Sequence, residues 1–328
     1  MPLNSQATCW VVTDGKTGME NQCLGLAKAL GLTPIVKRVK LRSLWRRLAP
    51  YLRIGLRAAF GPEGDPIVPP WPDLLIATGR LSVPAALYVK RVNPATFTVQ
   101  LQNPVIAPSN FDLVVVPQHD ELHGPNVMNT RGSLSSSCVT PEMLKSEAEK
   151  LAPQIAHLRP PRIAVLIGGS NAVYRLTPNA VKRFAAQLNE AAIATGGCLL
   201  VTPSRRTGAG NLALLKDAVR GISSYIWDGQ GDNPYYGMLG LADYIVVTCD
   251  SVNMVSEACA TGKPVHVIDL PGGSPKFNRF HKNLRGSGLT RAFEGRVERW
   301  SYEPLDDVKL VAARIAKELQ KRKTGRET

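Results

Sequence analysis

The chain has 328 residues, of which 44% are hydrophobic and 20% charged, a balance typical of globular proteins and not of disordered or fibrous ones. Lysine and arginine number 40 against 26 acidic residues, so the formal charge is +14 and an anionic partner is expected: nucleic acid, phospholipid or a phosphorylated substrate. Neither a signal pattern nor an apolar run of the roughly 18–20 residues that span a membrane is evident, so we expect a cytoplasmic protein, free or peripheral on the cytoplasmic face of a membrane.

Short apolar runs alternate with helical patterns along the chain. Continuous apolar strands separated by helices predict parallel sheets that are covered on both faces. The expected strands are Cys9–Thr13, Ile35–Val39, Asp73–Ala77, Thr96–Leu101 and Asp112–Val116, followed by Arg162–Ile167, Cys198–Thr202, Ser224–Trp227, Tyr244–Thr248 and Val265–Asp269. Expected helices include Glu20–Leu30, Val83–Arg91, Pro178–Ala191, Ser251–Ala260 and Asp306–Lys321.

The two series of strands predict an α/β protein with two Rossmann-like domains. A charged helix over about 141–151 and the Arg159-Pro160-Pro161 punctuation separate them. We therefore expect an amino-terminal domain over 1–152 and a carboxy-terminal domain over 158–304. A helix in 305–328 is expected to pack back on the first domain. Ligands of such sheets bind where strands end and helices begin, so the site is expected between the two domains.

The first strand-end loop has the layout of an anion cradle, because it follows a strand, contains two glycines and opens a helix. It includes the tail of a Walker A motif, but Trp10 stands where the leading glycine is required, which argues against a P-loop ATPase. Two interpretations stay open, a tight turn with an incidental lysine and a phosphate or acceptor loop. The residues concerned are Gly15, Lys16, Gly18, Asn21 and Gln22.

Two further loops lie at strand ends in the second domain. Gly168, Gly169 and Ser170 offer backbone amides and a hydroxyl to an anion. After the next strand, Arg205 and Arg206 are flanked by hydroxyls, and adjacent arginines can hold a diphosphate through bidentate hydrogen bonds. The flanking hydroxyls belong to Ser204 and Thr207.

The most informative stretch is 242–258, where a buried strand runs into a polar helix start. Asp250 and Ser251 are suited to cap the helix, and hydroxyl and amide groups at a helix start suit phosphate oxygens. Glu257 follows one to two turns later, where a carboxylate can accept hydrogen bonds from a ribose diol. Asn253 and Ser256 lie on the same helix.

These segments resemble known proteins over nearly the whole chain. The stretch after residue 242 is similar to the donor-nucleotide half of GT-B glycosyltransferases. More specifically, five segments of the chain resemble the elongated-mitochondria (mitochondrial fission) family. They are Trp10–Gly25, Thr202–Thr207, Asn233–Tyr235, Thr248–Ala258 and Lys276–His281. The resemblance implies a GT-B fold, with two Rossmann-like domains whose parallel sheets face a central cleft. This compact chain resembles the bacterial branch, whose members look like glycosyltransferases; the plant member is associated with recruiting a dynamin-like protein to mitochondria.

The resemblance implies a nucleotide-diphosphate-sugar site in the carboxy-terminal domain. The implied residues are Gly168, Gly169, Ser170, Ser204, Arg205, Arg206, Ser251, Asn253 and Glu257. The sugar nucleotide would be a substrate, and no cofactor is expected. No Asp-x-Asp motif supports a metal, and the six cysteines form no Cys-x-x-Cys pair and are expected to be reduced and buried.

Residues Lys37–Arg57 contain eight basic residues and no acid, more than half of the formal charge. Leucines and Trp45 recur there at helical spacing, so we expect an amphipathic helix in the plane of an anionic membrane surface, with Arg42, Arg46 and Arg47 around its apolar face. Ordinary docking of the helix on the sheet is the alternative. Nucleic acid is disfavoured, because no aromatic residues are interleaved as stacking platforms.

A general base for the acceptor hydroxyl is expected in the amino-terminal domain. Asp14 and His119 both follow strands and are the candidates, although a turn histidine without a catalytic role fits His119 equally well. His281, near Arg279 and Lys276, is a further candidate for contacting donor phosphates.

Two functions follow as hypotheses. The first is transfer of a sugar, with inversion, from a nucleotide-diphosphate donor to a membrane-associated acceptor, an envelope lipid or glycan. The second is a non-catalytic membrane adaptor with the same fold that recruits a protein partner, such as a dynamin-like fission protein.

Overall fold

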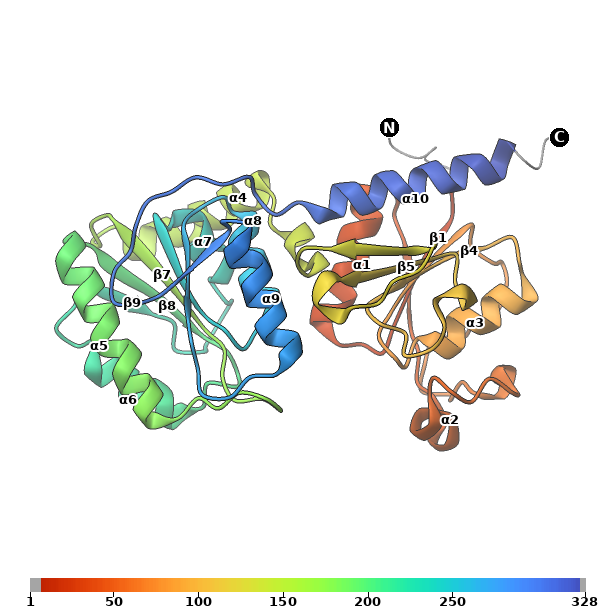
Figure 1. Cartoon of the computed structure of the whole chain (residues 1–328), viewed down its shortest axis with the longest axis horizontal. Helices are drawn as coiled ribbons and strands as arrows, with labels where there is room; N and C mark the ends of the chain where they lie inside the picture. Colours follow the sequence, from red (N-terminus) through yellow and green to blue (C-terminus); the bar gives the residue numbers. More distant parts are fainter. Residues whose placement is uncertain (1–6, 325–328) are drawn as a thin grey trace. The chain divides into compact units, whose positions relative to one another are not determined.

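The computed structural model describes residues 7–324, which form two compact units, each built around a six-stranded sheet (Figure 1). The first unit contains the residues up to 137 together with those from 306 onward. The second contains 138–305. All strand pairs within the two sheets are parallel.

The first sheet has the order β2-β1-β3-β4-β5-β6. Its strands are β1 (Cys9–Thr13), β2 (Ile35–Arg38), β3 (Leu74–Thr78), β4 (Phe97–Leu101), β5 (Leu113–Pro117) and β6 (Val127–Thr130). Side chains alternate between the two faces. Leu74 and Ile76 of β3 belong to one buried cluster, and Leu75 and Ala77 belong to the other. Both faces are therefore covered, which explains the continuous apolar runs of the central strands.

Helices from both ends of the described chain cover one face of this sheet. Side chains of α1 (Thr17–Ala29) and α10 (Asp307–Thr324) share one buried cluster with β1, β3, β4 and β5. On the other face, α3 (Val83–Val92) packs on the second cluster. The helix expected in 305–328 thus belongs to the first unit.

The second sheet has the order β12-β11-β10-β7-β8-β9. Its strands are β7 (Arg162–Ile167), β8 (Cys198–Pro203), β9 (Ser224–Ile226), β10 (Tyr244–Thr248), β11 (Val265–Ile268) and β12 (Thr290–Ala292). Its helices are α4 (Pro141–Leu151), α5 (Pro178–Thr195), α6 (Ala209–Ala218), α7 (Tyr235–Leu241), α8 (Val252–Ala260) and α9 (Pro275–Gly286). Every strand expected from the sequence is present, with ends shifted by no more than a residue, whereas β6 and β12 were not expected.

Helix α4 packs on α7 in the second unit, although the sequence placed residues up to 152 in the first. Close approach is possible because α7 carries glycines where the helices touch. A Cβ at Gly237 would lie 2.7 Å from the carbonyl oxygen of Glu147, and one at Gly240 would lie 2.5 Å from that of Leu144.

The basic segment differs most from its expected form. In place of one amphipathic helix over Lys37–Arg57, its start forms β2, and the six-residue α2 (Ser43–Leu48) and the 3-10 helix η1 (Leu56–Ala58) follow. Helix α2 ends before Ala49-Pro50, because the residue that precedes a proline disfavours helical geometry. The prediction of a continuous helix was therefore wrong. No helix in the described part of the chain is long and apolar enough to cross a membrane.

Candidate functional site

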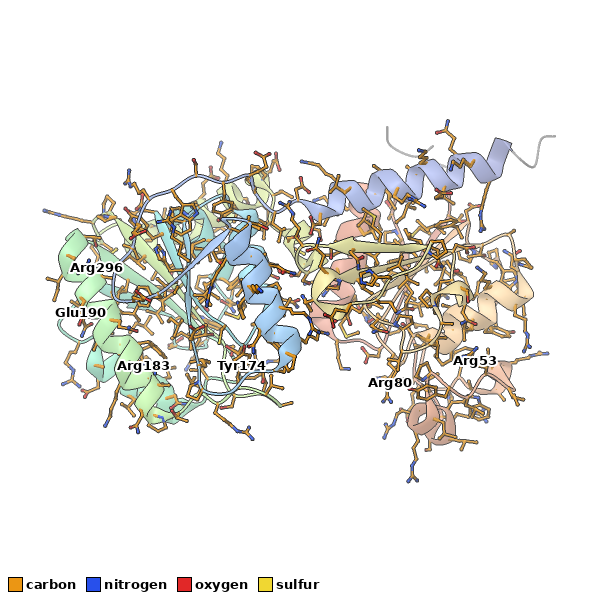
Figure 2. All side chains as sticks on the ribbon, viewed as in Figure 1. Arg53, Arg80, Tyr174, Arg183, Glu190 and Arg296 are labelled. Carbon is orange, nitrogen blue, oxygen red and sulfur yellow. The ribbon has the colours of Figure 1, made fainter. Side chains whose placement is uncertain are left out.

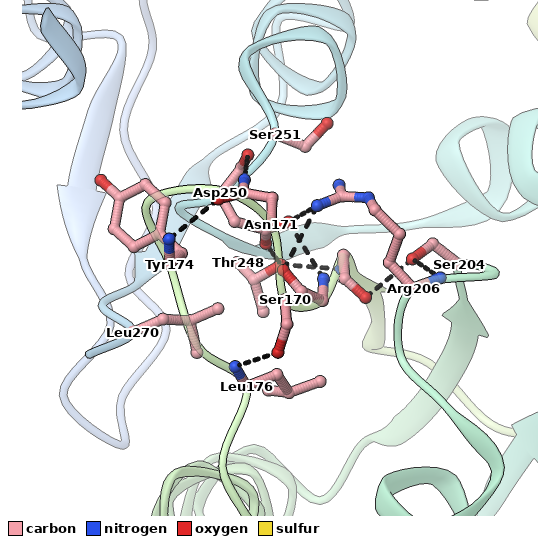
Figure 3. Close-up of polar contacts among 12 residues, drawn as sticks. Ser170, Asn171, Tyr174, Leu176, Ser204, Arg206, Thr248, Asp250, Ser251 and Leu270 are labelled. Atoms are coloured by element: carbon pink, nitrogen blue, oxygen red, sulfur yellow. Dashed lines mark hydrogen bonds and ion pairs between the residues drawn. The ribbon is translucent and has the colours of Figure 1, made fainter. Parts of the chain in front are cut away.

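Three loops of the second unit meet at the carboxyl ends of adjacent strands. Strand β7 lies between β8 and β10, so the loops 168–171, 204–207 and 249–251 share one edge of the sheet. Figure 3 shows their polar contacts. The structure thus brings the three groups of donor-binding candidates together, although they are spread over more than 80 residues.

Asp250 is the centre of this cluster. Its side chain has no exposed surface, accepts hydrogen bonds from the Gly169 amide (3.0 Å) and the Thr248 hydroxyl (2.7 Å), and pairs with the Arg206 guanidinium at 2.7 Å (Figure 3). Its backbone carbonyl accepts from the Asn171 side-chain amide at 3.1 Å. A buried carboxylate is stable only when paired in this way. Asp250 therefore ties the loops together and is not itself accessible to a ligand.

The paired glycines allow the loops to approach each other. A Cβ on Gly168 would lie 2.3 Å from the Asp250 carboxylate, and one on Gly169 would lie 2.1 Å from the carbonyl oxygen of Arg206. Their amides donate to the Thr248 hydroxyl at 2.8 Å and to Asp250. The sequence suggested that these amides bind an anion, but in the structure they are engaged within the protein.

The hydroxyls around these glycines have the same internal role. Ser204 and Thr207 donate to the Gly168 carbonyl at 2.7 and 2.6 Å, and the Ser170 hydroxyl accepts from the Leu176 amide at 2.9 Å. These side chains fix the shape of the loops and so position the groups beside them.

The adjacent arginines are not equivalent. Arg206 is committed to Asp250 and to the Gly169 carbonyl at 3.3 Å. Arg205 is exposed, and its guanidinium has no hydrogen-bond or ion-pair partner within the described chain. Arg205 is thus the member of the pair whose guanidinium is accessible from solvent, whereas Arg206 positions the loop.

Helix α8 begins at this edge. The Ser251 hydroxyl caps it by accepting from the Met254 amide at 3.4 Å, and Asn253 lies in its first turn. The amino-terminal end of a helix carries partial positive charge and favours anions. Ser256 is buried and donates to the Val252 carbonyl at 2.7 Å, so its role is structural.

Glu257, also on α8, accepts a hydrogen bond from the Tyr235 hydroxyl at 2.7 Å. Burial, and then the neighbouring Glu257 carboxylate, raise the pKa of Tyr235 well above its usual value, so this phenol stays a donor. The bond fixes the position of the Glu257 carboxylate. Tyr235 was not among the predicted site residues, although it lies in the Asn233–Tyr235 segment that carries the family resemblance.

A pocket of about 610 Å³ adjoins these loops. It lies where β10 and β11 end, and α9 lines one side. Tyr174 packs edge-on against Phe277 of α9, with ring centroids 5.1 Å apart, and Figure 2 shows it beside that helix. The lining residues are Tyr174, Cys249, Asp269, Leu270, Gly272, Asn278, His281, Lys282, Arg285 and Gly286.

The polar lining of this pocket is partly inert and partly available. Burial raises the pKa of the Cys249 thiol to about 11, so the thiol is not a nucleophile. His281 is bonded to the Cys249 carbonyl at 2.8 Å, and burial lowers its pKa, which makes it a neutral anchor instead of a cation for phosphates. Lys282 and Arg285 are exposed cations on α9, Arg285 paired with Asp269 at 3.2 Å. Neither was predicted, although α9 carries Lys or Arg at every third position from 276 to 285.

The first unit carries the base candidates at two separate strand ends. Asp14 follows β1, and Lys16 contacts its carboxylate at 2.8 Å. His119 lies in the 3-10 helix after β5, and only 3% of it is exposed. Two strands separate β1 from β5, which corresponds to roughly 14 Å. The structure therefore does not bring the two together.

The predicted acceptor loop forms the expected turn and helix start. Gly15 has φ +88° and Lys16 precedes α1, so the turn requires a glycine. Gly18 and Asn21 lie in the first turns of α1. Gln22 is buried and donates to the Gly18 carbonyl at 3.2 Å, which leaves it a structural role. No group of three or more metal-ligating side chains occurs in either unit as far as the structure describes them.

Comparisons with known proteins identify the family. The family model for mitochondrial fission ELM1 matches residues 17–319, and the chain belongs to this family. The mitochondrial fission protein ELM1 of Arabidopsis thaliana is 29% identical, with 95% of this chain and 91% of that protein covered. An uncharacterised protein of Rickettsia prowazekii is 26% identical, with 92% and 96% covered.

Solved structures show that the fold is GT-B. The UDP-GlcNAc 2-epimerase of Neisseria meningitidis, bound to UDP-GlcNAc, matches with a TM-score of 0.52 and 13% identity over 96% of this chain and 99% of that one. A putative UDP-N-acetylglucosamine 2-epimerase of Listeria monocytogenes matches with a TM-score of 0.58 and 10% identity, covering 96% and 90%. MurG of Acinetobacter baumannii matches at 0.50 and 15% identity, covering 97% and 92%.

Proposed function

We propose that the second unit binds a nucleotide-diphosphate sugar and that the protein transfers the sugar to an acceptor at a membrane surface. The observation that carries the proposal is the meeting of three strand-end loops around Asp250, beside the start of α8 and a pocket of about 610 Å³. Several structural neighbours are described as UDP-GlcNAc 2-epimerases, which is consistent with a nucleotide-sugar ligand.

The groups around the loops divide naturally among the parts of such a donor. Arg205 and the amino-terminal end of α8 supply positive potential for the diphosphate. Glu257 accepts hydrogen bonds from the ribose hydroxyls. The pocket beside α9, with Asp269, Asn278 and Lys282, offers hydrogen-bonding groups to the sugar. Arg206, Asp250 and the two glycines hold this arrangement in shape.

The transfer needs stabilisation of the leaving group and removal of one proton. The acceptor oxygen forms a bond to the anomeric carbon as the bond to the diphosphate breaks, so negative charge grows on the diphosphate. Arg205 and the α8 terminus offset that charge electrostatically. The acceptor hydroxyl loses its proton to a base, for which Asp14 is the stronger candidate because His119 is buried. Attack from the opposite face would invert the anomeric centre.

Membrane association is proposed for the basic segment of the first unit. Leu44, Leu48, Tyr51 and Ile54 are exposed there, the last with 79% of its surface accessible. Exposed apolar residues surrounded by arginines are typical of surfaces that enter the interface of an anionic bilayer. The family name gives the second candidate function, a membrane adaptor that recruits a fission protein.

Nucleotide binding tests the proposal and separates it from the adaptor. We expect one nucleoside diphosphate, or its sugar conjugate, to raise the melting temperature selectively, because the ligand binds only the folded state. Arg205→Gln and Glu257→Gln should each weaken that binding about tenfold, since each removes a charged hydrogen-bonding group. Arg220→Gln is the matched control, because Arg220 is exposed and forms a surface ion pair with Asp217. If no nucleotide binds the wild type, the donor site is refuted and the adaptor is favoured.

A further inference from the structure

The excursion formed by residues 40–61, here called the basic loop, is a closed and braced structure. Its two ends run side by side. The Arg42 amide donates to the Ala59 carbonyl at 2.9 Å, and the Gly61 amide donates to the Lys40 carbonyl at 2.7 Å. Ala49, Leu56 and Ala59 are buried, which anchors the loop. Figure 1 shows α2 set apart from the sheet of its unit.

The outer part of the basic loop is also braced. The Trp45 indole donates to the Ile54 carbonyl at 3.1 Å, and Gly55 has φ +61°, which allows the chain to turn beneath that ring. The indole thus holds α2 against residues 51–55. As a result, the exposed apolar residues of the loop are presented on a preformed scaffold.

A pocket of about 430 Å³ lies at the base of the basic loop. Its walls are largely apolar and aromatic: the Phe60 and Tyr88 rings meet edge to face at 5.7 Å, and Ile67 is buried beside them. The lining residues are Arg42, Arg57, Phe60, Gly61, Pro62, Gly64, Asp65, Pro66, Ile67, Val68 and Tyr88.

Two arginines supply the charge of this pocket. Arg57 is exposed and has no hydrogen-bond or ion-pair partner among the described residues. Arg42 uses its Nε to donate to the Phe60 carbonyl at 3.3 Å, which leaves its two terminal nitrogens available. Asp65, the acid in the lining, accepts from the Arg38 amide at 2.7 Å and so belongs to the loop base.

The neighbourhood determines which kind of anion fits. Arg46 and Arg47 on α2 add charge, and the exposed side chains of Leu44, Leu48 and Ile54 lie on the same loop. A fully hydrated anion would gain nothing from the apolar walls. An anion that carries a hydrocarbon chain satisfies the arginines and the walls together.

We propose that this pocket binds the phosphate of an anionic phospholipid while the apolar tip of the basic loop enters the bilayer interface. The proposal rests on the membrane association proposed above and adds a defined lipid site to it. Arg42 and Arg57 would hold the phosphate, and Phe60, Ile67 and Tyr88 would contact the start of the lipid chains.

Binding of a soluble lipid is the direct test. The probes are monomeric dihexanoyl phosphatidic acid, dihexanoyl phosphatidylcholine and inorganic phosphate, with affinities measured by calorimetry on the full chain. The anionic lipid should bind more tightly than the other two. Arg42→Gln and Arg57→Gln should each weaken it about fivefold, and the double variant roughly 25-fold. Equal affinity for inorganic phosphate would overturn the lipid assignment, and unchanged affinity in the double variant would overturn the site.

Controls separate the pocket from overall charge, folding and nucleotide binding. Arg91→Gln removes one exposed charge from α3 of the same unit and should change lipid affinity less than twofold. Leu44→Ser with Ile54→Ser should reduce flotation with phosphatidylglycerol vesicles but spare binding of the monomeric lipid. The melting temperatures should stay within a few degrees. Nucleotide affinity should be unchanged in the pocket variants. A wild type that binds the lipid and no nucleotide would refute only the donor site.

Discussion

Asp250 shows how one buried residue can hold several loops together. Its carboxylate is fully buried and joins three loops through Gly169, Thr248 and Arg206. From the sequence it was expected to take part in donor binding or helix capping. In the structure, Ser251 is the cap, and Asp250 holds the loops that surround it.

Asp250→Asn is expected to lower the stability of the second unit by about 2 kcal/mol. Arg206 loses its charged partner, and the asparagine side chain has one acceptor oxygen where the carboxylate has two, which accept from Gly169 and Thr248. The Arg206 side chain would keep its hydrogen bond to the Gly169 carbonyl but lose the ion pair that also holds it, so nucleotide binding should weaken as well. Thermal unfolding with and without nucleotide measures both effects. Asp217→Asn alters an exposed surface pair and is the control, with an expected change below about 0.5 kcal/mol. Equal melting temperatures for the two variants would contradict the assigned role.

At the scale of elements, helix α7 explains why α4 belongs to the second unit. Gly237 and Gly240 remove the side chains that would separate α7 from α4. The Lys263 ammonium donates to the carbonyls of Leu239 and Gly240, both at 2.7 Å, and so closes the carboxyl end of α7. Burial lowers the pKa of Lys263 to about 8, the cost of placing this amine under the helix.

Gly240→Ala is expected to destabilise the second unit by about 1–3 kcal/mol, because the new methyl group would overlap the Leu144 carbonyl and force α4 away. Gly210→Ala is the matched control. Nothing lies within 4 Å of a Cβ at Gly210 on α6, and alanine favours a helix, so this variant should be neutral or slightly more stable. Urea unfolding followed by circular dichroism compares the two. A neutral Gly240→Ala would show that the α4–α7 contact is looser than described.

The basic loop shows where helical periodicity misleads. Its leucines recur at helical spacing through 52, but Pro50 stops α2 after six residues. Leu41 pairs with Phe60 in an isolated bridge and does not lie on a helix face.

At the scale of the whole molecule, the chain leaves the first unit at residue 137 and returns to it at 306. The return is fixed by Asp307, whose carboxylate accepts from the amides of Arg131 (2.5 Å) and Gly132 (3.1 Å). Val311 and Ile315 of α10 are then fully buried in the same core as α1.

Asp307→Asn should weaken the attachment of α10 to the rest of the first unit. We expect faster hydrogen exchange in α10 and at 131–132, unchanged exchange in β7 and β8, and a loss of about 1–3 kcal/mol in the first unit, because both amides lose their charged acceptor and the Arg131 guanidinium loses its ion-pair partner. Asp306→Asn is the neighbouring control, since Asp306 forms a surface ion pair with Lys309. Exchange that rises equally in both variants would argue against a specific role for Asp307.

The sequence by itself determined the ten expected strands, most of their helices and the loops in which the candidate site lies. These features depend on local periodicity and on the order of elements, which neighbouring residues encode. Only the tertiary structure decided which groups remain available to a ligand. Gly169 and Asp250 are 81 positions apart, and the Gly169 amide donates its hydrogen bond to the Asp250 carboxylate. The same carboxylate pairs with Arg206, so both groups are occupied within the protein. The choice of partner depends on which groups folding brings within hydrogen-bonding distance, and no local pattern records that.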